Sequence, residues 1–238
     1  MKNKMKRNRR NSKTLVLIGI VLILVGLIIF LIPRFNSAII KHNQQKASTN
    51  ELSADKIKKN KDSKASFDFE KVNNISTTGT WGNIDKYNVE NIIGQIVIPN
   101  RHINLTLFKG VDEANLVAGA GTMKADQEMG KGNYTVAGHR ALDSGVLFHE
   151  LLDAKEGDEV RITDKENIYI YRIKETKITD PYALYMLDDE RMAEYGEKPI
   201  ITLMTCYKIA EDKFDRFFAV GTLEKTIPYT KEAMEKAQ

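Results

Sequence analysis

Hydrophobic and polar positions follow three different patterns along this chain. Residues 14–32 form an uncharged apolar run, residues 34–79 are rich in Lys, Asn, Ser, Asp and Gln, and residues 81–225 carry short apolar segments separated by turns. As a helix, the nineteen residues of the first run would be about 28 Å long, close to the hydrocarbon thickness of a bilayer. The pattern predicts a membrane-spanning helix, a solvated polar spacer with helical stretches, and one folded domain.

The folded domain is expected to be mostly β. Its apolar segments are short, rich in β-branched residues and bounded by turn residues, which is typical of a barrel or a sandwich. The expected strands are residues 92–98, 104–109, 133–138, 159–163, 167–175, 200–205 and 216–223. Short connecting helices are expected at 146–153 and 188–195, a hairpin turn at 164–167, and a frayed polar helix at 230–238.

Basic residues gather in front of the apolar run. Seven Lys and Arg residues lie within residues 2–13, and positively charged flanks stay on the cytoplasmic side of a membrane. The expected topology is a single-pass protein of the cell membrane with a cytoplasmic N-terminus and an extracellular domain. A cleaved signal peptide, cut after residues 36–38, is the alternative, but the apolar region of such a peptide is usually only about 7 to 15 residues long.

These boundaries divide the chain into five expected parts. They are a cytoplasmic tail (residues 1–13), a transmembrane signal anchor (14–32), an extracellular polar spacer (33–80), the folded domain (81–225) and a polar C-terminal tail (226–238). The net charge says little about function. Outside the cytoplasmic tail the chain has 29 of its 36 Lys and Arg and all 32 Asp and Glu, which gives a net charge of about −3. Nucleic-acid binding is not expected.

Cys206 is the only cysteine of the chain and ends the apolar run 200–206. A lone cysteine is more often an inert core residue, but a single thiol outside the cell is a candidate nucleophile. Its thiolate form needs a nearby base or positive charge. Of the four histidines, His139 is the best candidate, since it follows a strand whose small Ala137 and Gly138 would let another chain or a substrate approach closely.

Arg216 is a second candidate because of the face on which it lies. Strand alternation places it beside Phe214, Phe218 and Val220, and a guanidinium on an apolar face is costly unless it is paired. One interpretation is an ion pair with a carboxylate of residues 188–190. The other is a hydrogen bond to a substrate backbone or to a developing oxyanion.

Several motifs, taken in order, resemble those of the sortases, cysteine transpeptidases of Gram-positive bacterial surfaces. The resemblance covers residues 90–224 and rests on GQIVIP at 94–99, GAGTM at 119–123, Ala137-Gly138-His139, TLMTC at 202–206, which matches the family's TLxTC signature, and Arg216. An N-terminal anchor without a second hydrophobic segment at the C-terminus is similar to the housekeeping class A enzymes.

The resemblance implies an eight-stranded β-barrel in which Cys206, His139 and Arg216 converge at one end of a groove. Cys206 would cleave LPxTG-like sorting signals of surface proteins between Thr and Gly and hold the acyl group as a thioester. His139 would protonate the leaving amine and deprotonate the incoming one, while Arg216 would hold the substrate carbonyls. The implied acceptor is an amine of lipid II or of a peptidoglycan cross-bridge. No cofactor is implied.

Family position also suggests where the sorting signal binds, although any of these side chains could equally be ordinary core. Residues 179–198, here called the cleft segment, correspond to the loop that shapes the cleft in relatives, and residues 207–215 are expected to help select the acceptor. The candidate cleft residues are Ala137, Leu184, Met186, Leu187, Met204, Thr205 and Phe218.

A calcium requirement is not expected. One calcium-stimulated relative places acidic residues in the loop before the histidine strand, where Lys124 and Lys131 of this chain would repel a cation. Lys124 would instead bridge to an acidic residue of the cleft segment.

Two other functions fit the same residues. The first is an extracellular cysteine peptidase that releases peptides to water. The second is a non-catalytic, membrane-tethered binding module in which Cys206 is part of the core. Partition of the product between amine adduct and acid separates the first from a transpeptidase, and the Cys206→Ala variant separates the second.

Overall fold

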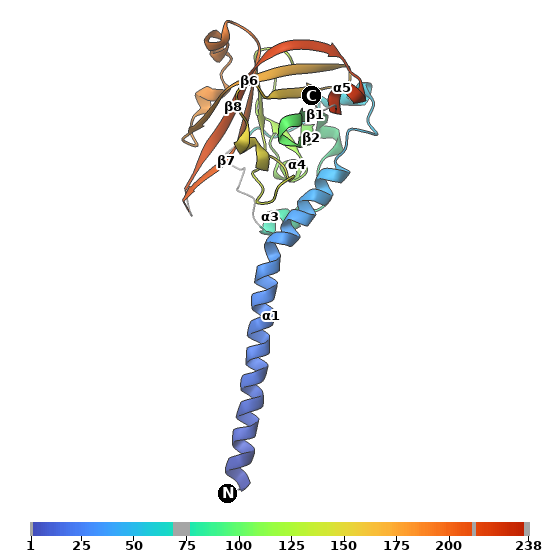
Figure 1. Ribbon diagram of the computed structural model, residues 1–238. Coiled ribbons are helices and arrows are strands. Elements are labelled where there is room, and N and C mark those ends of the chain that lie inside the picture. Colours follow the sequence, from blue (N-terminus) through green and yellow to red (C-terminus); the bar gives the residue numbers. More distant parts are fainter. Residues whose placement is uncertain (1, 69–76, 211–212, 236–238) are drawn as a thin grey trace.

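The structure is a computed structural model that describes residues 2–68, 77–210 and 213–235. In this part of the chain, eight strands close into a barrel in the order β1-β2-β3-β4-β7-β8-β6-β5 (Figure 1). The strands are β1 (Ile92–Ile98), β2 (Ile103–Phe108), β3 (Ala120–Thr122), β4 (Asn133–Ala137), β5 (Glu159–Thr163), β6 (Asn167–Thr179), β7 (Ile200–Ala210) and β8 (Lys213–Pro228).

Apart from the long N-terminal helix α1, the helices are short and connect the strands or lie on the outside of the barrel. The α-helices are α1 (Lys2–Lys46), α2 (Ala54–Asn60), α3 (Thr77–Gly82), α4 (Glu113–Leu116) and α5 (Lys231–Glu235). The 3-10 helices are η2 (Val89–Asn91), η3 (Pro99–Arg101), η4 (His149–Asp153), η5 (Leu184–Leu187) and η6 (Asp189–Tyr195).

Strand β1 is apolar along almost its whole length because both of its faces are covered. Ile96 and Ile98 belong to the main core inside the barrel. On the outer face, Val97 packs with Met234 of α5, and Ile92 packs with Ala47 at the end of α1. A strand buried on both faces loses the alternation of apolar and polar residues, which explains the run at 92–98.

The parallel pair β4 and β7 sets the position of the site. Asn133 to Ala137 of β4 lie beside Ile200 to Met204 of β7 in register. Parallel neighbours require a long crossover connection, and here it spans residues 138–199. β8 pairs antiparallel with the other edge of β7, so β7 has a partner on each side.

The expected eight-stranded barrel is confirmed, and the sandwich is excluded by the closed strand order. Every expected strand is present, but β6, β7 and β8 are longer than expected, and the sequence pattern does not predict β3. The helices expected at 146–153 and 188–195 are shorter 3-10 helices, η4 and η6.

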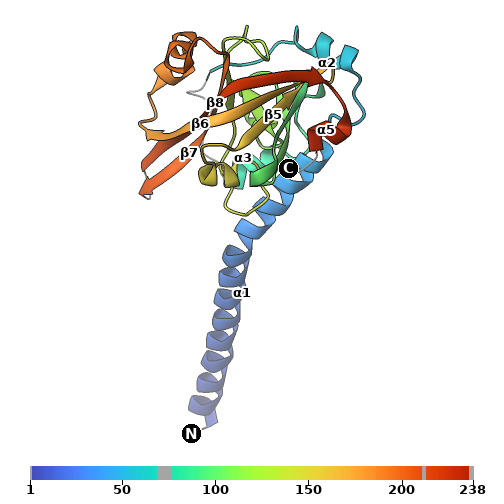
Figure 2. The same cartoon turned by 45° about the horizontal axis from the view of Figure 1, so that its top comes forward.

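Helix α1 is continuous from Lys2 to Lys46 and contains one candidate membrane span, found within residues 13–46. The most apolar window of the span is 0% buried within the protein. Figures 1 and 2 show the helix extending away from the barrel and bending as it reaches the domain. Pro33 lies inside α1 and accounts for a bend of this kind, because proline removes a hydrogen bond of the helical ladder.

The expectation of a solvated spacer at residues 33–80 is wrong for the residues that dock on the barrel. Ile40 and Ile57 are 2% and 0% exposed, and Ile40 belongs to the main core. Asn43 Nδ2 donates a hydrogen bond to the Asn83 carbonyl at 3.1 Å, and Asn60 Nδ2 donates one to the Ile92 carbonyl at 2.8 Å. The polar composition of this segment gave no sign of docking, because a few apolar residues are enough to anchor the end of α1 and the short helix α2 on the barrel.

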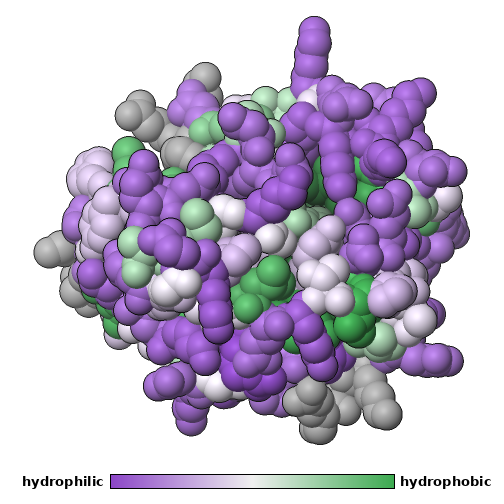
Figure 3. All heavy atoms as spheres, turned by 90° about the horizontal axis from the view of Figure 1, so that it is seen from above, coloured by the Kyte–Doolittle hydropathy of each residue, from purple (hydrophilic) through white to green (hydrophobic). Residues whose placement is uncertain are grey.

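The C-terminal tail also differs from the expectation of a frayed end. Strand β8 continues to Pro228, and α5 then packs on the outside of the barrel with Met234 0% exposed. Arg161 Nη1 donates a hydrogen bond to the Ala233 carbonyl of α5 at 2.9 Å. The domain therefore extends beyond residue 225. Viewed from the side opposite α1, its surface is mostly hydrophilic with small hydrophobic patches (Figure 3).

Candidate active site

Cys206 and Arg216 face each other across the β7–β8 pair. They are direct partners in the antiparallel register, which places their Cβ atoms about 4.5–5.5 Å apart on the same face. Cys206 is partly exposed and is not in a disulfide, and Arg216 is also partly exposed. A thiol and a guanidinium are thus brought together by strand register alone.

His139 follows directly after β4, beside the segment of β7 that carries Cys206. Two hydrogen bonds fix this relation: the Gly138 N–H donates to the Met204 carbonyl at 3.1 Å, and the Thr205 hydroxyl donates to the Gly138 carbonyl at 2.9 Å. Each bond joins the residue before His139 to one of the two residues before Cys206. The backbones that carry the thiol and the imidazole are therefore held in place by neighbouring strands.

Gly138 lines the apolar groove and is also required for packing. A Cβ atom at this position would lie 2.5 Å from Cδ2 of the Phe148 ring, a distance that real Cβ contacts do not reach. Phe148 is 0% exposed, and its N–H donates to the His139 carbonyl at 3.1 Å. The expected close approach at Gly138 is thus made by the protein's own ring, which also supports His139.

Burial keeps the imidazole and the thiol neutral in the free protein. His139 is 4% exposed, and burial lowers its pKa to about 4. Burial likewise raises the pKa of the Cys206 thiol, and this effect is opposed by the positive charges of Arg216 and Arg140. A thiol with an imidazole is consequently the resting form, and the thiolate–imidazolium pair is a minor form near neutral pH.

His139 has an unused nitrogen with which to exchange a proton. Within the described residues, its buried Nε2 has no hydrogen-bond partner. An unpaired buried nitrogen costs free energy, and such atoms are concentrated at sites where they have a task. Nε2 is therefore available to take a proton from an attacking thiol or amine.

An apolar groove of about 500 Å³ leads to these three residues. It is lined by Cys206, His139 and Arg216 at one end, and Val111, Leu116 and Met123 form part of its wall. The cleft segment forms another part of the wall, with residues 181–184 and Leu187. The shape and lining suit an extended, largely apolar peptide segment with a reactive carbonyl at the polar end.

Most of the expected cleft residues line this groove, and one does not. Those that line it are Ala137, Leu184, Leu187, Met204, Thr205 and Phe218. Met186 is instead 0% exposed in a core cluster with Ile200 and Val220, so its placement in the cleft is corrected. It lies on the buried side of η5, whereas Leu184 of the same helix is 58% exposed.

Sequence reasoning missed other parts of the groove and its surroundings. Val111, Leu116 and Met123 precede the histidine strand, and no pattern in the sequence marks them as lining residues. Tyr182 is 85% exposed at the groove, a signal that appears only in the folded chain. Arg140, whose charge acts on the Cys206 thiol, is adjacent to His139 in the sequence and could have been noticed on that ground.

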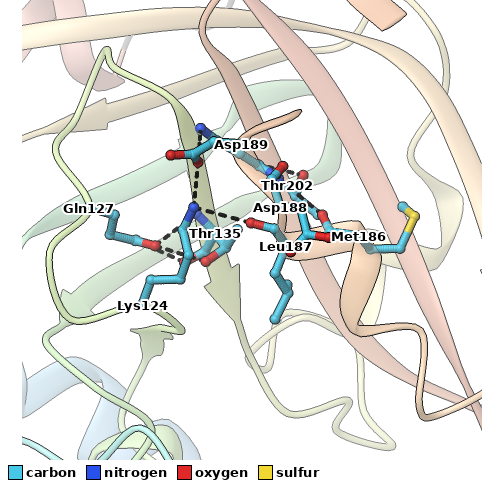
Figure 4. Close-up of polar contacts among 9 residues, drawn as sticks. Lys124, Gln127, Thr135, Met186, Leu187, Asp188, Asp189 and Thr202 are labelled. Carbon is cyan, nitrogen blue, oxygen red and sulfur yellow. Dashed lines mark hydrogen bonds and ion pairs between the residues drawn. The ribbon is translucent and has the colours of Figure 1, made fainter. Parts of the chain in front are cut away.

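Lys124 joins the loop before β4 to the cleft segment, as expected from the sequence. Its Nζ lies 2.6 Å from Asp189 Oδ1 and donates to the Leu187 carbonyl at 3.1 Å. Asp189 Oδ1 also accepts the Asn133 N–H at 2.9 Å. Burial opposes ionisation, yet these hydrogen bonds hold the pKa of Asp189 below its ordinary value. Figure 4 shows this network.

Asn133 and Gln127 complete the network around β4. Asn133 Nδ2 donates to the carbonyls of Met186 and Asp188 at 3.0 and 3.1 Å, and its Oδ1 accepts the Thr202 hydroxyl at 2.8 Å (Figure 4). Gln127 Oε1 accepts the Thr135 hydroxyl at 2.8 Å. Asn133 therefore fastens the cleft segment to β4 and, through Thr202, ties β4 to β7.

The contacts of Asp189 argue against the first interpretation of Arg216, an ion pair with residues 188–190. Asp189 is paired with Lys124, and the ion pairs of the described residues include none between Arg216 and residues 188–190. The hydrogen bond described for the guanidinium goes from Nη1 to the Asp215 carbonyl at 3.4 Å. Arg216 thus keeps most of its donors for a ligand in the groove.

Comparison with known proteins agrees with this geometry. A protein-family model described as the Sortase domain matches residues 96–224, more than half of the chain. The chain belongs to the sortase family. Sortase A of Listeria monocytogenes is 39% identical over 219 residues, covering 92% of this chain and 96% of that protein. Sortase A of Streptococcus agalactiae is 35% identical, with 89% of this chain and 84% of that protein covered.

Solved sortase structures share the barrel. The structure of sortase A from Listeria monocytogenes has a TM-score of 0.55 at 40% sequence identity and covers 62% of this chain and 99% of that chain. These relationships make the protein a sortase of class A, a cysteine transpeptidase that anchors surface proteins. Its N-terminal apolar helix is consistent with membrane attachment.

Proposed function

We propose that this sortase cleaves LPxTG-like sorting signals between Thr and Gly and transfers the surface protein to an amine of lipid II or of a peptidoglycan cross-bridge. The observation that carries the proposal is the convergence of Cys206, His139 and Arg216 at the polar end of one apolar groove. The Leu-Pro part of the signal would occupy the apolar part of that groove, between Ala137, Met204 and the cleft segment.

The reaction begins with attack of the Cys206 sulfur on the Thr carbonyl carbon. His139 receives the thiol proton and passes it to the departing glycine amine as the C–N bond breaks, which leaves a thioester on Cys206. Arg216 donates hydrogen bonds to the substrate carbonyls, where negative charge develops. The thioester conserves the energy of the peptide bond, so the acceptor amine can be joined without ATP.

Topology and domain division form part of the same proposal. The apolar run at 14–32 would span the membrane, with residues 1–13 in the cytoplasm and the barrel on the outer surface, where sorting signals and cell-wall precursors meet. Support comes from the apolar helix and from the basic residues that precede it. The folded unit would include the docked parts of residues 33–80 and 226–238.

The test is a reaction of the full chain in detergent micelles with an LPETG peptide and candidate amines, followed by mass spectrometry. A thioacyl adduct on Cys206 and an amide product are expected, with more amide than acid when amine is supplied. Predominant acid would favour the peptidase alternative, and no adduct would refute the proposal.

Arg216→Lys provides a sharper test of the groove. The substitution keeps the positive charge but loses the planar fork of donors, so cleavage should fall by about 10²-fold or more, comparable to loss of an oxyanion donor. Arg101→Lys serves as the control and should retain full activity. Arg101 lies in the turn after β1 and pairs with Asp158, which precedes β5.

A further inference from the structure

A second pocket opens onto the same catalytic pair from the side of helix α1. It has a volume of about 350 Å³ and is lined by His139 and Cys206, which also line the apolar groove. Its opposite wall is formed by α1, through Ile32, Asn36 and Ser37 among others. This space is called the membrane-side pocket. A thioester on Cys206 is thus accessible from two directions, one along the groove and one along α1.

In the proposed topology, the membrane-side pocket would lie at the depth of the lipid headgroups. Ile32, the last residue of the apolar run, is part of its wall, and Asn36 lies one helical turn further, about 6 Å along the axis. Asn36 Oδ1 accepts a hydrogen bond from Trp81 Nε1 at 2.7 Å, and the Trp81 side chain is 49% exposed. Tryptophan is enriched at this depth of a membrane. With this topology the pocket would face molecules held in the outer surface of the bilayer.

The charge of the pocket is positive and is not neutralised by its lining. Arg140 and Lys208 line it, and none of its described lining residues is Asp or Glu. Arg140 Nε is buried without a hydrogen-bond partner in the described part of the chain. Arg140 also lowers the pKa of the Cys206 thiol, although burial is the larger effect and raises it, so the guanidinium acts on the reacting sulfur. An anionic group could therefore be held close to the thioester carbon.

We propose that the membrane-side pocket is the acceptor site, and that it binds a primary amine carrying a carboxylate close to the amine, on a lipid-linked cell-wall precursor. Arg140 holds the carboxylate with its two-donor fork, a geometry that guanidinium groups favour. Because Arg140 and Cys206 line the same pocket, a carboxylate held by Arg140 would lie near the amine that attacks the thioester. The inference rests on the proposed transpeptidation and assigns its second substrate.

The transfer step balances with the groups present. The amine nitrogen attacks the thioester carbon, the new C–N bond forms and the C–S bond breaks. His139 takes a proton from the attacking nitrogen and returns it to the sulfur, which regenerates the Cys206 thiol. The acyl chain stays in the apolar groove while the amine enters from the opposite side, so the donor and the acceptor do not compete for space.

The first experiment measures how the thioester partitions between amide and acid. The full chain in micelles is given an LPETG peptide with either diaminopimelic acid or its diamide, and both products are quantified by mass spectrometry. The wild type should favour the carboxylate-bearing amine about tenfold. Arg140→Gln should abolish that preference, and Arg140→Lys should retain part of it. Arg34→Gln, an exposed arginine of α1 that does not line the pocket, should match the wild type.

The second experiment fills the pocket from the helix side. Ser37→Trp should reduce the ratio of amide to acid about tenfold, because the indole occupies the path of the amine while the groove stays open. Ala38→Trp is the matched control, since Ala38 is an exposed neighbour on the same helix outside the lining, and should leave the ratio unchanged. The thioacyl adduct on Cys206 is measured in each variant.

The outcomes separate the two proposals. If the thioacyl adduct forms normally and the ratio of amide to acid is the same in the wild type, Arg140→Gln and Ser37→Trp, the acceptor site is refuted and the proposed function stays intact. Complete absence of the adduct in the wild type refutes both. If Arg140 instead holds a lipid phosphate, the Arg140→Gln effect will appear only in vesicles containing phosphatidylglycerol and without carboxylate preference, which overturns the carboxylate assignment.

Discussion

Burial of His139 makes the stability of the protein sensitive to acid. The folded state lowers the pKa of this histidine from 6.5 to about 4, so the unfolded chain binds the proton more tightly. Protonation therefore favours unfolding. The contribution of His139 is fully present above about pH 6.5 and is lost progressively as the pH falls towards 4, at a cost of about 3 kcal/mol.

His139→Gln should remove this dependence. We expect the free energy of unfolding of the wild type to fall more steeply between pH 7 and pH 4 than that of the variant, by about 3 kcal/mol, in urea titrations at several pH values. His102→Gln changes an exposed histidine in a turn and should follow the wild type. Parallel losses in wild type and His139→Gln would show that His139 is not the buried neutral group described here.

The sequence identified the candidate residues better than their surroundings. Alternation marked Arg216 as a charged residue on an apolar face and His139 stood out beside small residues, but only the family resemblance placed either of them near Cys206; the register that pairs Cys206 with Arg216 comes from the structure. The buried Met186 could not be told from the lining residue Leu184, because a crossover built from short 3-10 helices has no period from which a buried face can be deduced. The need for glycine at position 138 likewise could not be predicted, because it depends on packing against the ring of Phe148 in the folded chain.

At the scale of elements, Lys124 fastens the cleft segment to the loop before β4. Lys124→Ala removes the 2.6 Å ion pair with Asp189 and the bond to the Leu187 carbonyl. A partly exposed ion pair contributes about 0.2–1 kcal/mol, so the KM for an LPETG peptide should rise about two- to fivefold with little change in kcat. Steady-state cleavage assays measure both parameters.

Lys131→Ala is the control for this change. Lys131 pairs with Glu128 in the same loop, but both side chains are exposed, so its removal should leave KM unchanged. Calcium should not activate the wild type, because the Lys124 ammonium already occupies the position between the loop and the cleft segment. A large activation that EDTA reverses would contradict this account.

The docking of α2 on the barrel yields a separate prediction about stability. Ile57 is 0% exposed, so Ile57→Ala should lower the free energy of unfolding by about 2–4 kcal/mol through lost burial and a residual cavity. Lys58→Ala alters the exposed neighbour and should stay within about 0.5 kcal/mol of the wild type. Thermal or urea unfolding of the full chain in micelles provides the measurement, and equal effects would mean that α2 is not docked.

These elements show where sequence patterns lose their information. β1 and β7 were evident because an apolar run of six or seven residues bounded by turns is typical of a buried strand. β3 has three residues, Ala120 to Thr122, too few to display an alternation. α2 and α5 each contribute only one or two buried residues to the barrel, and so their composition resembled that of a solvated tail.

For the whole molecule, the proposed topology can be tested with the protein's single thiol. A membrane-impermeant maleimide should label Cys206 in intact protoplasts, because the barrel is proposed to lie outside and Cys206 is partly exposed. The absence of other cysteines makes the signal unambiguous. Lysis should not increase the labelling.

A matched variant reports on the other end of the chain. In a Cys206→Ala background, Ser12→Cys introduces a thiol into the basic tail, and it should be labelled only after lysis. Labelling of Ser12→Cys in intact protoplasts, or of Cys206 only after lysis, would reverse the proposed orientation.

The parallel pairing of β4 and β7 has a consequence for how this protein can evolve. The thiol lies on β7, and the imidazole lies just after β4 at the start of the crossover, where Gly138 is tied to Thr205; the far end of the same crossover (residues 138–199) is the cleft segment. The connection that topology demands is thus the one that shapes the groove. Replacements or insertions in the cleft segment can alter which sorting signal is accepted while Cys206 and His139 keep their places, so a change of preferred substrate need not pass through an inactive ancestor.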